Sequence, residues 1–173
     1  MLVLNASPLI HISRAGYSWV FKKFKRELVI PRRVFNDVVV RGKEKGTPDA
    51  IITEKLVDNK AIEVVEVKDK DYLNFIKQLA SDFLKPLHEG EAEVMALARE
   101  RKAIAIIDES SAREVGKVLK IPIRGSIYLL VLLYKRRLIS KEGVMEAFEE
   151  MVKTGWRVSP RDYELIKKEL KKL

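Results

Sequence analysis

The sequence predicts an α/β protein, specifically a three-layer α/β/α sandwich around a central, mostly parallel sheet of about five strands. Short apolar runs alternate along the chain with longer segments of helical periodicity, which is the pattern of parallel strands joined by crossover helices. Several of these runs are apolar throughout, as in strands buried on both faces. With 173 residues and 47% hydrophobic content, the chain can bury a substantial core.

Five strands are expected. Residues 62–67 alternate apolar and acidic side chains, and Pro122 interrupts another run, so these two strands are expected at the edges of the sheet. The expected strands are residues 2–4, 28–30, 62–67, 103–107 and 121–123.

Helices are expected between and after these strands. Serines before helical segments predict N-caps at Ser7, Ser110 and Ser126. A buried helix opens at Glu91, because apolar residues surround its middle, and the glycine- and lysine-rich residues 41–47 are expected to form a loop. The other expected helices are residues 8–15, 18–25, 31–40, 48–59, 69–79, 112–119, 127–134, 141–153 and 160–172.

Composition limits the possible functions. The net charge of +9 favours a polyanionic partner, nucleic acid before an acidic membrane surface, although a lysine- and glutamate-rich surface of the thermophile kind is the alternative. The absence of cysteine excludes a disulfide framework, a zinc–thiolate site and a thiol nucleophile, and fits a reducing, cytoplasmic compartment. The N-terminus does not have the pattern of a signal peptide, and no apolar run is long enough to span a bilayer, so no membrane association is expected.

Polar residues follow the expected strand ends, where parallel α/β sheets bind ligands. Asn5 and Ser7 follow the first strand, Asp37 lies in the helix after the second, Glu91 opens the buried helix, and the pair Asp108–Glu109 follows the fourth strand. Hard oxygen ligands of this kind could hold Mg²⁺ or Mn²⁺ for phosphodiester hydrolysis. Each residue also has a structural explanation, as a helix cap, a surface ion pair or a partner of a helix dipole.

Basic residues gather early in the chain, with aromatic residues among them. A nucleic-acid-binding patch and a solvated helix face explain them equally well. The basic residues are Arg14, Lys22, Lys23, Lys25, Arg26, Arg32 and Arg33. Further along, Arg113 and Ser126 could contact phosphate, or could form a salt bridge and a helix cap instead.

The order and spacing of the acidic motifs resemble the PIN-domain family, a nuclease fold of many toxin–antitoxin toxins, and an uncharacterised subgroup of PIN-like proteins. The resemblance covers roughly residues 1–135, which leaves residues 136–173 as a C-terminal helical extension packed on the same domain. In the family the first strand ends in Asp-x-Ser, which is Asn5-Ala6-Ser7 here. Asp37 takes the place of a Glu, Glu91 that of an Asp opening an alanine-rich helix, and Asp108 or Glu109 that of the fourth acid.

The resemblance implies a metal-dependent endoribonuclease that hydrolyses single-stranded RNA. Asp37, Glu91 and Asp108 or Glu109 would ligate Mg²⁺ or Mn²⁺, with Asn5 as a neutral ligand, and Ser7, Ser126 and the basic residues would hold the RNA. The resemblance also implies a homodimer and a small antitoxin partner. Because Asn5 lacks the charge of the family's Asp, a degenerate fold that binds RNA or protein without cleavage is the alternative.

Overall fold

The structure is a computed structural model that describes residues 1–25 and 27–173. Its centre is a five-stranded sheet of order β3-β2-β1-β4-β5, in which every neighbouring pair is parallel. The strands are β1 (Leu2–Leu4), β2 (Leu28–Pro31), β3 (Ile62–Val65), β4 (Ile104–Ile106) and β5 (Ile123–Arg124). The expected parallel sheet is confirmed, and β3 and β5 are its edge strands, as predicted.

The first strand lies in the middle of the sheet. Leu2 of β1 is in register with Leu28 of β2 on one side and with Ile104 of β4 on the other. The chain builds β2 and β3 outward on one side, and then crosses over to build β4 and β5 on the other side. The order therefore reverses between β1 and β4, and ligands bind beyond the carboxyl ends of the strands at such a switch point.

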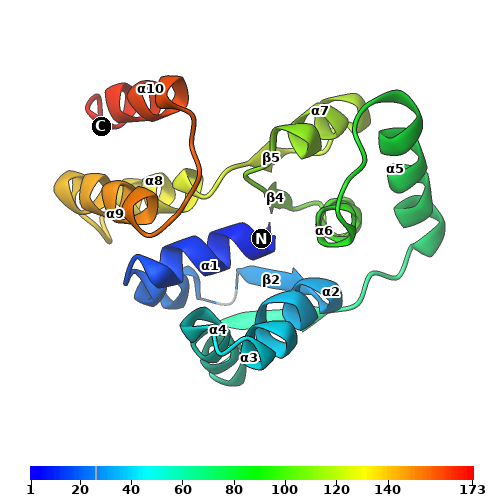
Figure 1. Cartoon of the computed structure of the whole chain (residues 1–173), viewed down its shortest axis with the longest axis horizontal. Helices are drawn as coiled ribbons and strands as arrows, with labels where there is room; N and C mark the ends of the chain where they lie inside the picture. Colours follow the sequence, from blue (N-terminus) through cyan, green and yellow to red (C-terminus); the bar gives the residue numbers. More distant parts are fainter. Residues whose placement is uncertain (26) are drawn as a thin grey trace.

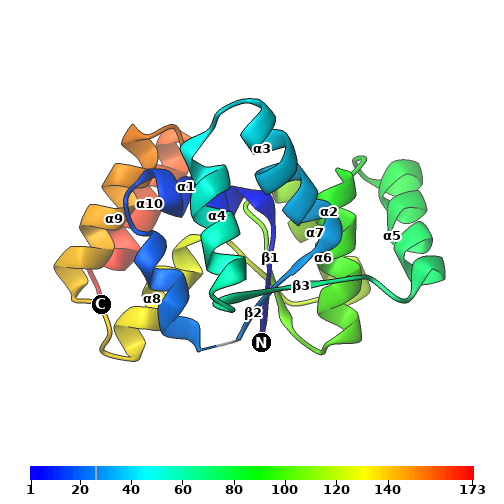
Figure 2. The same ribbon diagram turned by 90° about the horizontal axis from the view of Figure 1, so that it is seen from below.

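Helices cover both faces of the sheet, which confirms the three-layer sandwich (Figures 1 and 2). Helix α6 packs on β1, β2 and β4 and forms one layer with α5 and α7, while α1, η1, α4 and α8 form the other. The helices are α1 (Ala6–Arg14), η1 (Ser18–Phe24), α2 (Arg32–Phe35), η2 (Asn36–Val40), α3 (Arg41–Glu44), α4 (Pro48–Asp58), α5 (Lys70–Phe83), α6 (Glu89–Glu100), α7 (Ser110–Leu119), α8 (Ile127–Lys135), α9 (Lys141–Lys153) and α10 (Pro160–Leu170).

The core consists of the strands and the helix packed against them. All residues of β1 and β2 are buried, and α6 is buried from Gly90 to Ala98 except at Glu93, as its apolar sequence predicted. This burial holds the first turn of α6 beside the carboxyl ends of the central strands.

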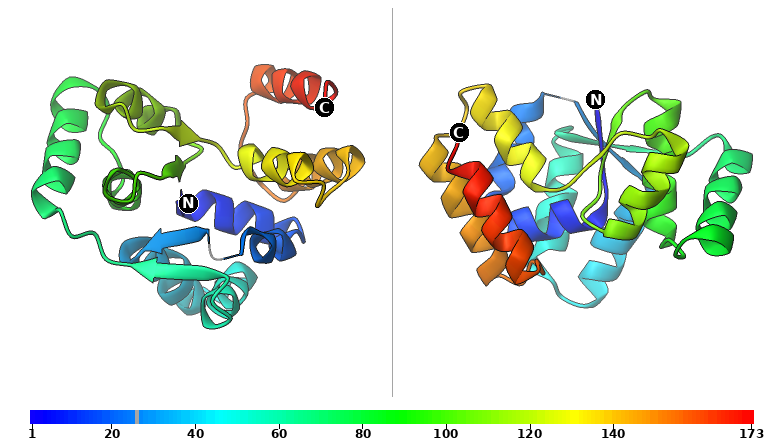
Figure 3. Two further views of the ribbon diagram at one scale, coloured as in Figure 1. Left: turned by 180° about the vertical axis from the view of Figure 1, so that it is seen from behind. Right: turned by 90° about the horizontal axis from the view of Figure 1, so that it is seen from above.

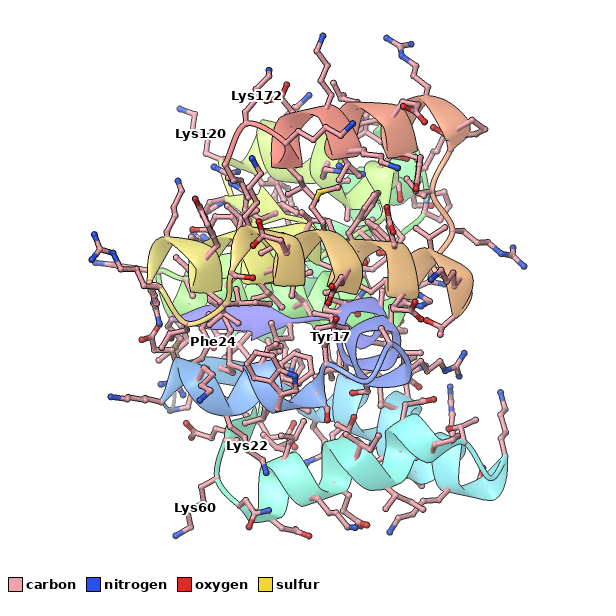
Figure 4. The ribbon with its side chains drawn as sticks, turned by 90° about the vertical axis from the view of Figure 1, so that its left-hand side faces the viewer. Tyr17, Lys22, Phe24, Lys60, Lys120 and Lys172 are labelled. Atoms are coloured by element: carbon pink, nitrogen blue, oxygen red, sulfur yellow. The ribbon has the colours of Figure 1, made fainter. Side chains whose placement is uncertain are left out.

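The C-terminal helices α9 and α10 lie beside α1 and α8, at the end of the molecule remote from α5 (Figure 3). Phe148 of α9 contributes to the same core as the strands, and its ring packs edge-on against Trp156 at a centroid distance of 6.1 Å. Tyr17 and Phe24 lie where η1 meets these helices (Figure 4). Residues 136–173 thus pack on the rest of the chain, and the domain boundary at residue 135 stays a prediction.

Two local expectations were wrong. The expected loop at residues 41–47 begins as helix α3, because α3 packs closely on α4: a Cβ at Gly42 would lie 2.8 Å from Ala50 Cβ. The expected caps at Ser7 and Ser110 are also wrong, since Asn5 is the N-cap of α1 and Glu109 is the N-cap of α7. Within the described residues, no helix has both the length and the apolar character needed to cross a membrane.

Candidate active site

The candidate site begins where β1 ends. Asn5 is 6% exposed, and its backbone N–H donates to the carbonyl oxygen of Ile106 at 3.0 Å, which ties it to the end of β4. A Cβ at Gly90 would lie 3.3 Å from Asn5 Oδ1 and 3.9 Å from Asp37 Oδ2. Because Gly90 has no side chain, the first turn of α6 can approach both residues, and the structure brings them together there.

Glu91 follows directly in the first turn of α6 and is only 2% exposed. Its Oε2 accepts a hydrogen bond from the backbone N–H of His88 at 3.0 Å. Burial raises the pKa of Glu91; the His88 hydrogen bond opposes this effect, and the nearby negative charge of Glu109 adds to it. Glu91 and Glu109 therefore repel each other, and solvent screens this repulsion little because Glu91 is buried.

Glu109 is the N-cap residue of α7, just beyond β4. Its Oε1 accepts a hydrogen bond from Ser7 Oγ at 3.1 Å, whereas its Oε2 is buried without a hydrogen-bond partner. Buried polar atoms without a partner are uncommon in native proteins, so this oxygen is a candidate for binding a ligand.

Asp108 differs from its neighbour, because both its carboxylate oxygens have partners within the chain. Oδ1 accepts from the backbone N–H of Ser126 at 2.7 Å, and Oδ2 accepts from Ser126 Oγ at 2.6 Å. Ser126 is the N-cap residue of α8, as expected, but its hydroxyl donates to Asp108 and so connects the end of β4 to the start of α8.

Asp37 lies in η2, a π-helical turn that follows α2 without a break. Its Oδ2 accepts from Arg33 Nε and its Oδ1 from Arg41, each at 2.8 Å, and its side chain is 26% exposed. The hydrogen bond with Asp37 raises the pKa of Arg33 further above its ordinary value. Asp37 therefore stands at the rim of the site, with its charge compensated by two arginines.

The donor set can be compared with the needs of a divalent ion. Within the described residues, no three His, Asp or Glu side chains lie close enough together to hold one ion. Glu91, Glu109 and the amide oxygen of Asn5 are nevertheless hard oxygen donors, and Mg²⁺ needs few protein ligands because it keeps several waters. The partnerless Glu109 Oε2 and the repulsion between Glu109 and the buried Glu91 both fit a cation at this place.

The expected RNA-binding residues do not form one surface at the site. Arg14 pairs with Asp49 at 2.8 Å, and Arg32 pairs with Glu66 at 3.2 Å. Lys22, Lys23 and Lys25 are exposed on or just after η1. Lys25 lies shortly before β2, at the amino end of that strand, whereas the acids lie at the carboxyl ends of the strands. Arg26 lies outside the described residues.

Arg113 does adjoin the site. Its guanidinium donates to the backbone carbonyl of Asp108 at 2.8 Å, and the side chain is exposed on the first turns of α7. Of the residues expected to bind RNA, Arg113, Ser7 and Ser126 lie at the carboxyl ends of the strands, together with Arg33 through its bond to Asp37.

A hollow of about 370 Å³ opens beside these acids, and we call it the acid hollow. It is lined by Ser7, His11, Asp108, Glu109, Gly155, Trp156 and Arg157. Sequence reasoning favoured a structural or exposed role for His11 over a place in the site, although its position one helical turn after Ser7 was a usable signal. Burial lowers the pKa of His11, and its Nδ1 is buried without a partner.

Trp156 and Arg157 were also missed. They come from the turn between α9 and α10, far beyond the acidic motifs, and no local pattern in the sequence connects them with Asp108 or Glu109.

The fold and the candidate site define an α/β protein with acidic side chains at the switch point of a parallel sheet, where such folds bind ligands. A family model described as a PIN domain, DUF3368, matches residues 1–172. The chain belongs to the PIN-domain family, and the match extends through α9 and α10. PIN domains are generally divalent-metal-dependent nucleases that act on nucleic acids. No curated protein matches the chain.

Proposed function

We propose that this PIN-domain protein is an endoribonuclease that hydrolyses phosphodiester bonds of single-stranded RNA with Mg²⁺ or Mn²⁺. The observation that carries the proposal is the pair of the buried Glu91 and the half-buried Glu109 at the switch point, in which Glu109 Oε2 is buried without a hydrogen-bond partner. Asn5 adds a neutral oxygen beside the same helix turn.

The side chains have separate roles in this proposal. Glu91, Glu109 and Asn5 would hold the ion, which when bound supplies Lewis-acid polarisation of the phosphoryl oxygen and a more acidic water. Ser7 orients Glu109 through its hydrogen bond, and Asp108 fixes the end of β4 through Ser126. Between the two candidates for the fourth acid, we therefore assign the ligand to Glu109.

Neutral substitutions test this assignment. Glu91→Gln and Glu109→Gln should each reduce Mn²⁺-dependent cleavage of single-stranded RNA by at least about 100-fold. Glu114→Gln, an exposed acid on the same α7, is the matched control and should cleave normally. Normal cleavage by Glu109→Gln, combined with loss of cleavage in Asp108→Asn, would transfer the ligand role to Asp108.

A degenerate PIN domain that binds RNA or protein without cleavage is the second candidate. Asn5 favours it, and so does Asp37, whose charge is already compensated by Arg33 and Arg41. Asn5→Asp discriminates the two functions: a modest improvement in existing cleavage supports the nuclease, whereas cleavage that appears only in the variant identifies a degenerate protein. Calorimetric titration of both proteins with Mn²⁺ checks that the substitution acts through metal affinity.

The proposal includes a cytoplasmic homodimer controlled by a small antitoxin, which rests on the family alone. In helix α8, Leu129, Leu130 and Leu133 are fully buried in their own chain, so these leucines are not available to a dimer interface. Light scattering tests the dimer. Growth arrest on expression of the wild type, but not of Glu109→Gln, tests the toxin role.

A further inference from the structure

The turn between α9 and α10 forms one wall of the acid hollow. Gly155, Trp156 and Arg157 line that hollow opposite side chains from α1 and from the end of β4. The C-terminal segment therefore does more than cover the core, since it reaches the residues to which the proposed function assigns the chemistry.

This turn is held in one conformation at both ends. Gly155 has φ +104°, a conformation that favours glycine, and its N–H donates to the carbonyl of Val152 at 3.1 Å. The N–H of Trp156 donates to the carbonyl of Met151 at 2.8 Å, which completes a Schellman motif. At the other end, Ser159 caps α10 by accepting from the N–H of Asp162 at 3.1 Å.

Arg157 projects from this fixed turn. Its side chain is exposed, and it takes part in none of the ion pairs found among residues 1–25 and 27–173. The neighbouring Trp156 is 9% exposed and packs against Phe148, so it anchors the turn rather than facing solvent.

A second hollow of about 440 Å³, which we call the outer hollow, shares Asp108, Trp156 and Arg157 with the acid hollow. Arg113 and Tyr128 also line it, and Ile127, Leu165 and Ile166 supply apolar surface. Its two acids are both engaged, because Asp108 is bonded to Ser126 and Asp162 accepts from Ser159 Oγ at 2.7 Å.

We infer that Arg157 is a substrate-binding residue that holds a phosphate of single-stranded RNA next to the cleaved one, while a neighbouring nucleobase enters the outer hollow. The inference deepens the proposed function and rests on it. An arginine fork suits a phosphate, and the aromatic and apolar side chains of the outer hollow, beside polar groups that can bond to base edges, suit an unstacked base. Arg157 lines both hollows, so one RNA strand could contact the acid hollow and the outer hollow at the same time.

The test measures RNA binding without cleavage. Fluorescence anisotropy with a short labelled single-stranded RNA in EDTA, over a series of salt concentrations, compares the wild type with Arg157→Gln and Arg161→Gln. Arg161 is an exposed arginine on the first turn of α10 that lines neither hollow, so both variants lose the same charge from the same segment. Circular dichroism verifies that both are folded.

Arg157→Gln should weaken binding about tenfold at low salt and reduce the slope of log affinity against log salt by about 0.7, the value for one phosphate contact on a single strand. Arg157→Lys should keep the slope, and Arg161→Gln should behave like the wild type. Equal effects of the two glutamine variants, with the wild type binding and cleaving RNA, overturn this inference alone. A wild type that neither binds nor cleaves RNA overturns the proposed function and this inference with it.

Discussion

Glu91→Gln is expected to stabilise the protein in the absence of metal while abolishing its activity. Glu91 is 2% exposed and lies near a second acid, Glu109, so its ionised form is disfavoured in the folded state. Glutamine retains the shape of the side chain and an oxygen that can accept the His88 N–H bond. The substitution therefore removes the charge and its repulsion but keeps the helix cap.

The size of the effect follows from the linkage between ionisation and stability. A tenfold change in an acid's dissociation constant is equivalent to about 1.4 kcal/mol. Burial and the charge of Glu109 raise the pKa of Glu91, and the His88 hydrogen bond offsets part of that. We expect the free energy of unfolding to rise by about 1 to 2 kcal/mol at neutral pH, which corresponds to about 2 to 8 °C in Tm for a chain of this size.

The pH dependence gives the sign of the effect. Because the pKa of Glu91 is raised in the folded state, its protonated form favours folding, and that contribution is lost as the pH rises through the folded-state pKa. Below the unfolded-state pKa the acid is protonated in both states, so the advantage of Glu91→Gln should vanish there.

Thermal denaturation in EDTA at acid and neutral pH measures the difference, with Glu114→Gln as the exposed control. Added Mn²⁺ should then raise the Tm of the wild type more than that of Glu91→Gln. If Glu91→Gln loses stability by the same amount at both pH values, the reasoning is refuted, and Glu91 is only a helix cap.

Two further predictions concern structural residues. Arg14→Ala should lower the free energy of unfolding by about 1 to 3 kcal/mol, because Asp49, whose side chain is 4% exposed, loses its charged partner. Urea denaturation should show this loss, and the double variant Arg14→Ala/Asp49→Asn should recover part of it. Unchanged RNA affinity of Arg14→Ala would exclude a direct role of Arg14 in RNA binding. Lys60→Gly should raise Tm, with a gain of about 0.5 to 1 kcal/mol in the free energy of unfolding. Lys60 adopts φ +56° at the end of α4, a conformation that favours glycine, and its side chain projects away from the fold (Figure 4). A lower Tm would contradict the prediction.

Much of the fold could be predicted from the sequence because burial restricts which side chains a strand or helix can carry. Strands buried on both faces must be apolar throughout, and a helix in the core must be apolar nearly all round, so β1 and α6 could be recognised residue by residue. The edge strands were recognisable for the opposite reason, since an edge position tolerates Glu63 in β3 and the proline before β5. Helix α3 was missed because close packing of Gly42 on Ala50 is a tertiary contact.

Side-chain partners could not be predicted in the same way. Ser7 and Ser126 have the composition of helix caps, yet their hydroxyls donate to Glu109 and Asp108, which lie far away in the sequence. The sequence left open which of these two acids faces the site, and only the hydrogen bonds distinguish them. His11, Trp156 and Arg157 join the site through folding alone, because three separate segments meet around the acid hollow.

The distribution of charge connects the proposals. The chain carries a net charge of +9, yet Lys25 lies near the amino end of β2, away from the acids, and Asp37 offsets one of the two charges of Arg33 and Arg41. A phosphate that approaches the acids Glu91 and Glu109 would be repelled unless cations lie close by. Arg113 and Arg157 at the rim, and a divalent ion between the acids, would supply that charge. Metal-free binding should therefore depend on the rim arginines, and cleavage on both.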